Sequence, residues 1–203
     1  MSETGGLRYV VSCGLLTLPI LAWNLIFARF LPPPLASPEF ERDIPRLVAY
    51  GENALRVVVM VLPFLMPLDL ATLGQRRGLL LFAAGTLLYF LAWVPLMIVP
   101  QSLWSTSWPG FVAPAYTPLI WLAGIGFTGG RLYGSWTLKP WIYIGLACAF
   151  VAFHVTHTSI VYARTYQHHA ANEDTARSGS ASSGDQSSVK TRHDWQSSTS
   201  RLG

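Results

Sequence analysis

The chain has few charged residues, and their shortage is uneven along its length. Asp, Glu, Lys and Arg make up 12% of its 203 residues, whereas a soluble domain usually carries roughly 25%. Residues 79–130 contain none of the four, while hydrophobic residues make up 51% of the chain. A soluble fold of this size could not hide so many apolar side chains behind so little charge. The composition therefore predicts an integral membrane protein.

Several motifs that carry chemistry are also missing. The two cysteines, Cys13 and Cys148, lie in apolar stretches and form no C-x-x-C pair, which argues against thiol redox chemistry and a cysteine zinc site. The sequence has no P-loop, and "YGSWT" lacks the G-x-S-x-G pattern of a catalytic serine. Five histidines are too few for a membrane di-iron oxygenase. The formal charge of +4 does not indicate a nucleic-acid partner, because the basic residues lie at the ends of apolar segments.

What the chain does contain is a series of apolar stretches long enough to cross a bilayer as helices, which takes about 20 residues each. Five stretches reach that length: 9–30, 54–73, 79–99, 111–128 and 141–163. The first is longer than the apolar region of a cleaved signal peptide, so we interpret it as a retained helix. The sequence thus predicts an all-α bundle of five transmembrane helices over residues 9–163.

The two ends of the chain differ from this apolar region. Residues 1–8 form a short N-terminal segment. Residues 164–203 are rich in Ser and Gly, mixed in charge and almost free of apolar side chains. Such a segment cannot offset the entropy lost on ordering. We therefore expect a disordered C-terminal tail.

The connection between the first two expected helices is the longest loop. The three prolines 32–34 predict a stiff, extended exit from the first helix. Asp43 is typical of a helix N-cap, with Pro45 just inside the new helix. We therefore expect the second helix to begin outside the hydrocarbon and to enter it near Glu52.

Loop charges give the expected orientation, since cytoplasmic loops of membrane proteins carry an excess of Lys and Arg. Two turns carry basic residues, namely Arg76 with Arg77 and Arg131 with Lys139. The turn over residues 100–110 has no charge at all. This contrast predicts a cytoplasmic N-terminus and an outside tail. Arg42 and Arg46 in the first long loop favour the opposite orientation.

Five antiparallel crossings would bring most of the intramembrane polar residues into one half of the bilayer. The ends of the first, third and fifth helices share a leaflet with the starts of the second and fourth. The polar residues at these places are Asn24, Glu52, Asn53, Arg56, Tyr116, His154, His157 and Thr158. Asp69 falls in the other half. We therefore hypothesise a polar pocket between the first, second and fifth helices.

Helical spacing supports this pocket, because residues three and four apart share a face. His154, His157 and Thr158 share one face of the fifth helix, and Glu52 and Arg56 share one face of the second. Polar side chains deep in lipid must turn towards partners or water. The plainer interpretation is structural. Glu52 and Arg56 would then form an ordinary ion pair at a helix start, and Asn24 and the histidines would hydrogen-bond between helices.

The histidine pair could also chelate a metal. Two histidines at i, i+3 can hold one transition metal ion, with Glu52 completing the set. They cannot supply both axial ligands of one haem, which must approach from opposite faces, and nothing specific supports a haem held by one histidine. A transition metal ion on His154, His157 and Glu52 is therefore one hypothesis for the site.

Three functions remain open at this point. The first is a membrane protein that binds or passes a small-molecule ligand through the polar pocket; five helices seldom enclose a whole pathway, which favours a homo-oligomer. The second is an intramembrane enzyme acting on a lipid or another apolar substrate, with His154 or His157 as general base and Glu52 as acid or orienting group. The third is a structural or assembly protein without a site. The lipid bilayer is the expected partner in all three.

Overall fold

The computed structural model describes residues 12–36, 38–130, 132 and 139–166, and the regular elements within these residues are helices. Met1–Tyr162 forms one compact unit, and Ala163–Gly203 forms a second. The expected N-terminal segment, residues 1–8, lies outside the described residues. Of the expected tail, only residues 164–166 are described, and they continue the last helix.

The first helical run, Cys13–Phe30, combines a 3-10 turn η1 (Cys13–Thr17), the α-helix α2 (Leu18–Phe27) and a second 3-10 turn η2 (Ala28–Phe30). Its end matches the sequence prediction. Pro19 sits in the first turn of α2, where a missing N–H costs no intrahelical hydrogen bond. The start of the run is tied to a distant turn, since the Cys13 N–H donates to the Met66 carbonyl over 2.8 Å.

The loop that follows is more compact than its prolines predict. Pro32 is extended, but the chain then forms two short 3-10 turns, η3 (Pro33–Leu35) and η4 (Glu39–Glu41). The Asp43 prediction is wrong: Asp43 has a φ of 53°, and the residue at the N-cap position of the next helix is Pro45, without a side-chain cap. The left-handed backbone is tolerated by Asp because its short side chain can hydrogen-bond locally.

The second run, Arg46–Leu65, joins α3 (Arg46–Val61) to the 3-10 turn η5 (Leu62–Leu65). It begins at Arg46, eight residues before the apolar stretch that starts at 54, and this agrees with the expectation that the helix begins beside Pro45. It ends eight residues before the predicted end at 73. The early end follows from Pro63, because proline cannot donate an α-helical hydrogen bond, and the backbone is extended at Met66.

The third run, α4 (Leu73–Ile98), begins six residues before the predicted start at 79. Thr72 and Gln75 form a capping box, in which each side chain bonds the other residue's backbone N–H. This cap extends the helix through the polar residues before the apolar stretch. Pro95 lies within the last turn of the run.

The fourth stretch is not the single helix predicted for residues 111–128. After α5 (Leu103–Thr106), the chain forms three pieces: α6 (Trp108–Phe111), α7 (Ala113–Tyr116) and α8 (Pro118–Thr128). A proline occupies the first or second position of each of these three pieces. Proline fits the first turn of a helix but not its interior, so closely spaced prolines divide the stretch.

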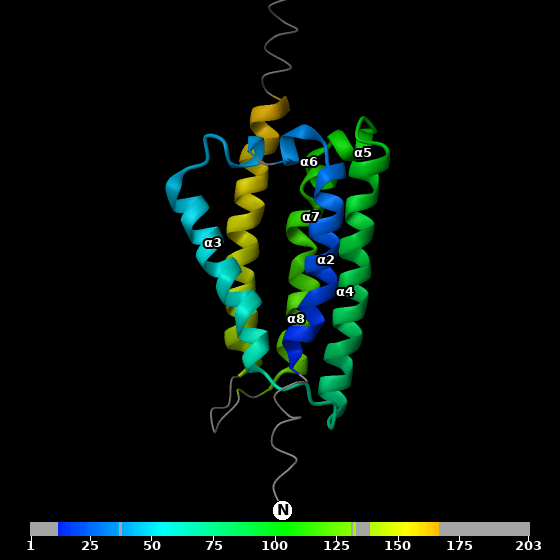
Figure 1. Cartoon of the computed structure of the whole chain (residues 1–203), viewed down its shortest axis with the longest axis vertical. Helices are drawn as coiled ribbons and strands as arrows, with labels where there is room; N and C mark the ends of the chain where they lie inside the picture. Colours follow the sequence, from blue (N-terminus) through cyan, green and yellow to red (C-terminus); the bar gives the residue numbers. More distant parts are fainter. Residues whose placement is uncertain (1–11, 37, 131, 133–138, 167–203) are drawn as a thin grey trace, which may run out of the picture. The chain divides into compact units, whose positions relative to one another are not determined.

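The last helix, Pro140–Tyr166, extends the prediction of 141–163 by a few residues at its C-terminal end. Within the first unit, successive long segments run in opposite directions (Figure 1). The α2–α3 loop, the end of α4 and the part of the last helix just before Ala163 therefore lie at one end of the unit. The sequence prediction that Asn24, Glu52 and His154 lie in the same half of the bilayer rests on this antiparallel arrangement.

The helices α4 and α8 pack closely against each other. A Cβ built on Gly85 would lie 2.5 Å from the backbone N of Trp121, and one on Gly78 would lie 2.8 Å from the backbone N of Thr128. Small residues let two backbones approach this closely. The buried core around this contact draws on several helices and includes Ile20, Val59, Phe82, Tyr89, Trp93, Trp121, Leu122, Ile125, Tyr143 and Phe150.

Four described helical runs are long and apolar enough to cross a membrane. They are Cys13–Phe30, Arg46–Leu65, Leu73–Ile98 and Pro140–Tyr166. The predicted fourth span is not among them, because its longest piece is the eleven-residue α8. The fold is thus all-helical over the described residues, with four membrane-compatible helices.

Candidate functional site

The site is built around Glu52, an acid buried in the first half of α3. Only 1% of its surface is exposed. One turn later on the same face, the Arg56 guanidinium donates to Glu52 Oε1 through Nη2 and to Asn53 Oδ1 over 3.2 Å through Nη1. The α3 helix thus positions one acid and one base at i, i+4, as the sequence predicts.

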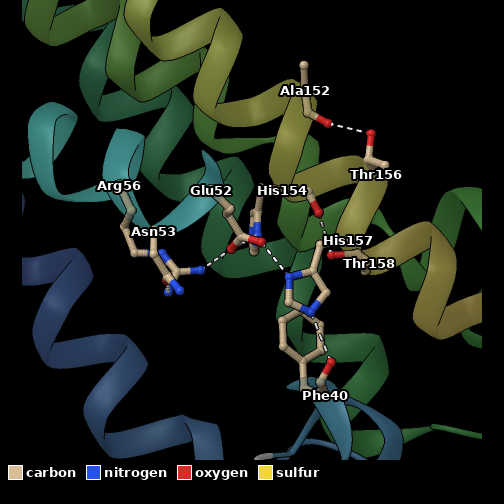
Figure 2. A network of polar contacts seen from close by, with 9 residues as sticks. All are labelled: Phe40, Glu52, Asn53, Arg56, Ala152, His154, Thr156, His157 and Thr158. Atoms are coloured by element: carbon tan, nitrogen blue, oxygen red, sulfur yellow. Dashed lines mark hydrogen bonds and ion pairs between the residues drawn. The ribbon is translucent and has the colours of Figure 1, made fainter. Parts of the chain in front are cut away.

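The last helix supplies two imidazoles to the same carboxylate (Figure 2). His154 Nδ1 lies 2.9 Å from Glu52 Oε1, and His157 Nδ1 lies 2.5 Å from Glu52 Oε2. The two histidines are one helical turn apart, so each reaches a different oxygen. The structure therefore brings Glu52, Arg56, His154 and His157 into one network, which we call the Glu52 cluster.

The α2–α3 loop closes one side of the cluster through Phe40, in η4. The Phe40 carbonyl accepts a hydrogen bond from His157 Nε2 over 2.9 Å. The Phe40 ring also stacks on the His157 ring, with centroids 4.2 Å apart and planes 16° apart. Both nitrogens of His157 therefore have partners (Figure 2). Nothing in the sequence singled out Phe40, because its position depends on how the loop folds back.

His154 has a different environment. Its ring stacks on Phe150 with a centroid separation of 5.5 Å, and 21% of its side-chain surface is exposed, against 6% for His157. Among the described residues its Nε2 has no hydrogen-bond partner. Thr158 joins the cluster only through the backbone, since its hydroxyl donates to the His154 carbonyl over 2.9 Å. His154 is thus hydrogen-bonded at Nδ1, whereas its Nε2 has no partner in the part of the chain that the structure describes.

Asn24 belongs to a second, smaller contact. Its Oδ1 accepts a hydrogen bond from the Tyr89 hydroxyl on α4 over 2.6 Å, and Tyr89 is only 5% exposed. The sequence analysis does not single out Tyr89, although it is among the few side chains with a hydroxyl in the apolar part of α4. Tyr116 also stands apart, because its hydroxyl donates to the Pro109 carbonyl. The expected polar layer therefore divides into separate contacts.

A cavity of about 390 Å³ joins the two main contacts. Its polar lining comes from Asn24, Arg56, Tyr89, His154 and Thr158, and the rest of the wall is apolar or aromatic. The apolar lining residues are Ile20, Leu21, Ala28, Leu31, Leu35, Phe40, Met60, Trp93, Phe111, Pro114, Ala115, Pro118, Trp121 and Phe150. The wall therefore includes α4 and the α6–α8 segments as well as the three helices expected from the sequence.

The cluster geometry is that of hydrogen bonds rather than of a metal centre. Both Glu52 oxygens contact imidazole nitrogens directly, so no space separates them for an ion bound to all three groups. Within the described part of the chain, no group of three or more His, Cys, Asp or Glu side chains is arranged to hold a metal ion. The geometry does not support the chelate of His154, His157 and Glu52.

Comparison with protein-family models, with curated proteins and with solved structures finds no match to this chain. The functional argument therefore rests on the Glu52 cluster and the cavity beside it.

Proposed function

We propose that the chain is a membrane protein that crosses the bilayer five times, with the broken α6–α8 run as the fourth crossing. Four continuous helices have the length and composition of membrane spans. Trp108–Thr128 has about the 20 residues that a crossing needs. Breaks in a spanning helix are tolerated where the freed backbone groups face other protein segments. The outward apolar side chains support the proposal, since Leu25 is 85% exposed and Leu47 is 78% exposed.

Thiol labelling in sealed cells tests this topology. The positive-inside rule places Arg76 and Arg77 in the cytoplasm and the uncharged turn at 100–107 outside. In a background with both native cysteines replaced by serine, we expect Gln101→Cys to react with an impermeant maleimide from outside, and Ala71→Cys to react only after lysis. Reaction of both from the same side would contradict a crossing by α4, and the reverse pattern would overturn the orientation.

Within this bundle, we infer that the cavity binds a small, largely apolar ligand. The observation that carries this proposal is the composition of the cavity wall. The wall is mostly apolar and aromatic, with five polar side chains among the lining residues. Its volume lies within the roughly 300–1,000 Å³ of ordinary small-molecule sites, which share this composition. The polar groups are held in place by the Glu52 cluster and by the Asn24–Tyr89 hydrogen bond.

Tryptophan quenching tests ligand binding, because Trp93 and Trp121 line the cavity. The probe is ω-bromodecanol, a neutral amphiphile whose bromine quenches tryptophan on contact. In lipid nanodiscs we expect a saturable quenching component above the linear part that arises from partition into the bilayer. The Ala28→Phe substitution adds a ring to the cavity wall and is expected to abolish the saturable part.

The matched control is Leu25→Phe, which adds a ring on the exposed side of the same helix. We expect it to keep the saturable component. Quenching that is linear in the unmodified protein, or saturable quenching that survives Ala28→Phe unchanged, would overturn the proposal. The first of these results would favour the third function, a packing protein without a site.

A second candidate function follows from His154 alone. Its Nδ1 lies 2.9 Å from the Glu52 carboxylate, which favours a hydrogen on that nitrogen, so the neutral ring would carry its lone pair on Nε2. A carboxylate-oriented imidazole on a cavity wall is the arrangement of a general base. In ester hydrolysis, for example, Nε2 would take a proton from water as the water oxygen bonds the acyl carbon. The bond between the acyl carbon and the alkoxy oxygen would then break, and Nε2 would return the proton to the leaving alcohol.

Hydrolysis of p-nitrophenyl decanoate tests this alternative. General-base catalysis contributes roughly 10²–10⁴-fold, so an enzyme would lose about that factor in the His154→Gln variant. The control is Thr156→Ala on the exposed side of the last helix, where the native hydroxyl bonds only the Ala152 carbonyl. Equal rates for the three proteins and for empty nanodiscs would exclude this reaction.

A further inference from the structure

Hydrogen-bond counting sets a lower limit on the positive charge of the Glu52 cluster. The His157 Nε2 faces the Phe40 carbonyl, which can only accept, so this nitrogen carries a hydrogen. One further proton lies between His157 Nδ1 and Glu52 Oε2, which are 2.5 Å apart. Whether that proton stays on the nitrogen or on the oxygen, the Glu52–His157 pair carries no net charge.

The remaining members leave the cluster positively charged. Arg56 is always protonated in proteins, and it shares Glu52 Oε1 with His154 Nδ1. The sum is therefore at least +1, because the Glu52–His157 pair is neutral, the Arg56 guanidinium is positive and an imidazole ring adds no negative charge. No acidic side chain other than Glu52 contacts these groups in the described part of the chain, and none lines the cavity.

The nearest acids in the loop do not change this sum. Glu39 and Glu41 flank Phe40 but are exposed, and Glu39 pairs with Arg42 at 3.5 Å. The Arg56 side chain is 43% exposed and forms part of the cavity wall, and a cation that faces an apolar wall within a membrane is unfavourable without a counter-charge. A negative group in the cavity, next to Arg56 and His154, would compensate it.

We propose that the ligand of this cavity is an amphiphile with a single anionic head, either a free anionic amphiphile or an anionic membrane lipid. The head contacts the Arg56 guanidinium, and the tail packs against Trp93, Trp121 and Phe150. This inference rests on the proposed binding function and names its ligand class. The shared chemistry is one negative charge joined to an apolar chain.

The test compares two brominated probes of the same chain length in zwitterionic nanodiscs. They are ω-bromodecane sulfonate, which is permanently anionic, and ω-bromodecanol, which is neutral. The readout is the midpoint of the saturable tryptophan quenching. A charge-assisted hydrogen bond is among the stronger polar contacts, so we expect the sulfonate to bind about tenfold more tightly than the alcohol, or better.

A charge variant then assigns the preference to the cluster. Arg56→Gln removes the guanidinium charge that faces the cavity, and we expect the two probes to differ by less than about twofold. The matched control is Arg46→Gln, an exposed arginine at the start of the same helix that does not line the cavity. It should keep the tenfold preference. If Arg56→Gln does not fold, the comparison of the two probes in the unmodified protein still tests whether the cavity prefers an anionic head.

The outcomes separate this inference from the function on which it rests. Saturable binding of both probes with equal midpoints, or tighter binding of the alcohol, overturns the anionic ligand and leaves the binding function standing. No saturable quenching by either probe overturns both. A preference that Arg46→Gln removes as fully as Arg56→Gln also contradicts the assignment to the cluster.

Nanodiscs that contain an anionic phospholipid distinguish the two sources of the ligand. If the phospholipid raises the midpoint of the sulfonate about tenfold or more, an anionic lipid headgroup occupies the cavity. If the midpoint is unchanged, a free amphiphile is the ligand. Both results keep the single anionic head, because the preference for the sulfonate has already been measured in zwitterionic discs.

Discussion

His157 Nδ1 lies 2.5 Å from Glu52 Oε2, although the two residues are 105 positions apart in the sequence. This contact joins the last helix to α3, and the Phe40 carbonyl on the other ring nitrogen joins both to the α2–α3 loop. The cavity wall beside His154 and Arg56 depends on these contacts. The first expected consequence concerns stability.

Replacing Glu52 by Gln should destabilise the fold, because a neutral amide cannot accept from all three donors that the carboxylate serves. We expect a loss of about 1–3 kcal/mol in the free energy of unfolding, the usual cost of unsatisfied buried groups. Chemical unfolding in detergent micelles measures it. Asn53→Ala, which removes only the exposed hydrogen bond from Arg56, should change stability by less than about 0.5 kcal/mol. Equal effects would contradict the central role of Glu52.

The packing of α4 on α8 gives a second expectation. Gly85→Leu places side-chain atoms against the Trp121 backbone, which cannot move as a flexible side chain can. We expect the variant to lose native monodispersity in detergent, with a melting temperature lowered by several degrees. Gly74→Ala is the control, since its nearest new neighbour is 3.9 Å away. It should melt at or slightly above the original temperature.

The Tyr89–Asn24 hydrogen bond should contribute modestly to the association of α2 with α4. Tyr89→Phe removes only the hydroxyl, and interhelical hydrogen bonds in membranes average about 0.6 kcal/mol. We expect a loss of that order in the free energy of unfolding. Tyr50→Phe, at a residue 73% exposed, should be neutral. A loss above about 2 kcal/mol for Tyr89→Phe would exceed the contribution of one interhelical hydrogen bond and would contradict this modest role.

Metal content tests the chelate that the sequence suggested. Because Glu52 contacts both imidazoles directly, we expect purified protein to contain much less than one transition metal ion per chain. The amount should not change in the His154→Ala, His157→Ala double variant. One equivalent of metal that the double variant loses would contradict the hydrogen-bonded cluster. The measurement is elemental analysis by mass spectrometry after removal of the affinity tag.

The sequence predicts the helical class and the meeting of α3 with the last helix, since both follow from long-range apolar patterning and helical spacing. It fails at several helix ends. The capping box of Thr72 and Gln75 extends α4 through polar residues that hydropathy excludes. Prolines divide the stretch 111–128, although membrane helices often tolerate them.

The candidate site is predictable to a similar degree. Glu52, Arg56, His154 and His157 are found because strongly polar residues are rare in apolar stretches. Phe40 is not found, because its role comes from a backbone carbonyl and a ring stack that carry no sequence signal. The partner of Asn24 is missed for a related reason, since tyrosine is common in membrane helices.

Thiol cross-linking of α3 to the last helix tests the central claim most directly, because the cluster exists only if the two helices meet at the level of Glu52. A Cβ on Gly51 would lie 2.7 Å from the Phe153 ring. With the native cysteines replaced by serine, we expect a short bifunctional thiol reagent to join Gly51→Cys to Phe153→Cys in native membranes. It should not join Gly51→Cys to Leu146→Cys, about two turns away on the last helix. Cross-linking to position 146 and not to 153 would contradict the account.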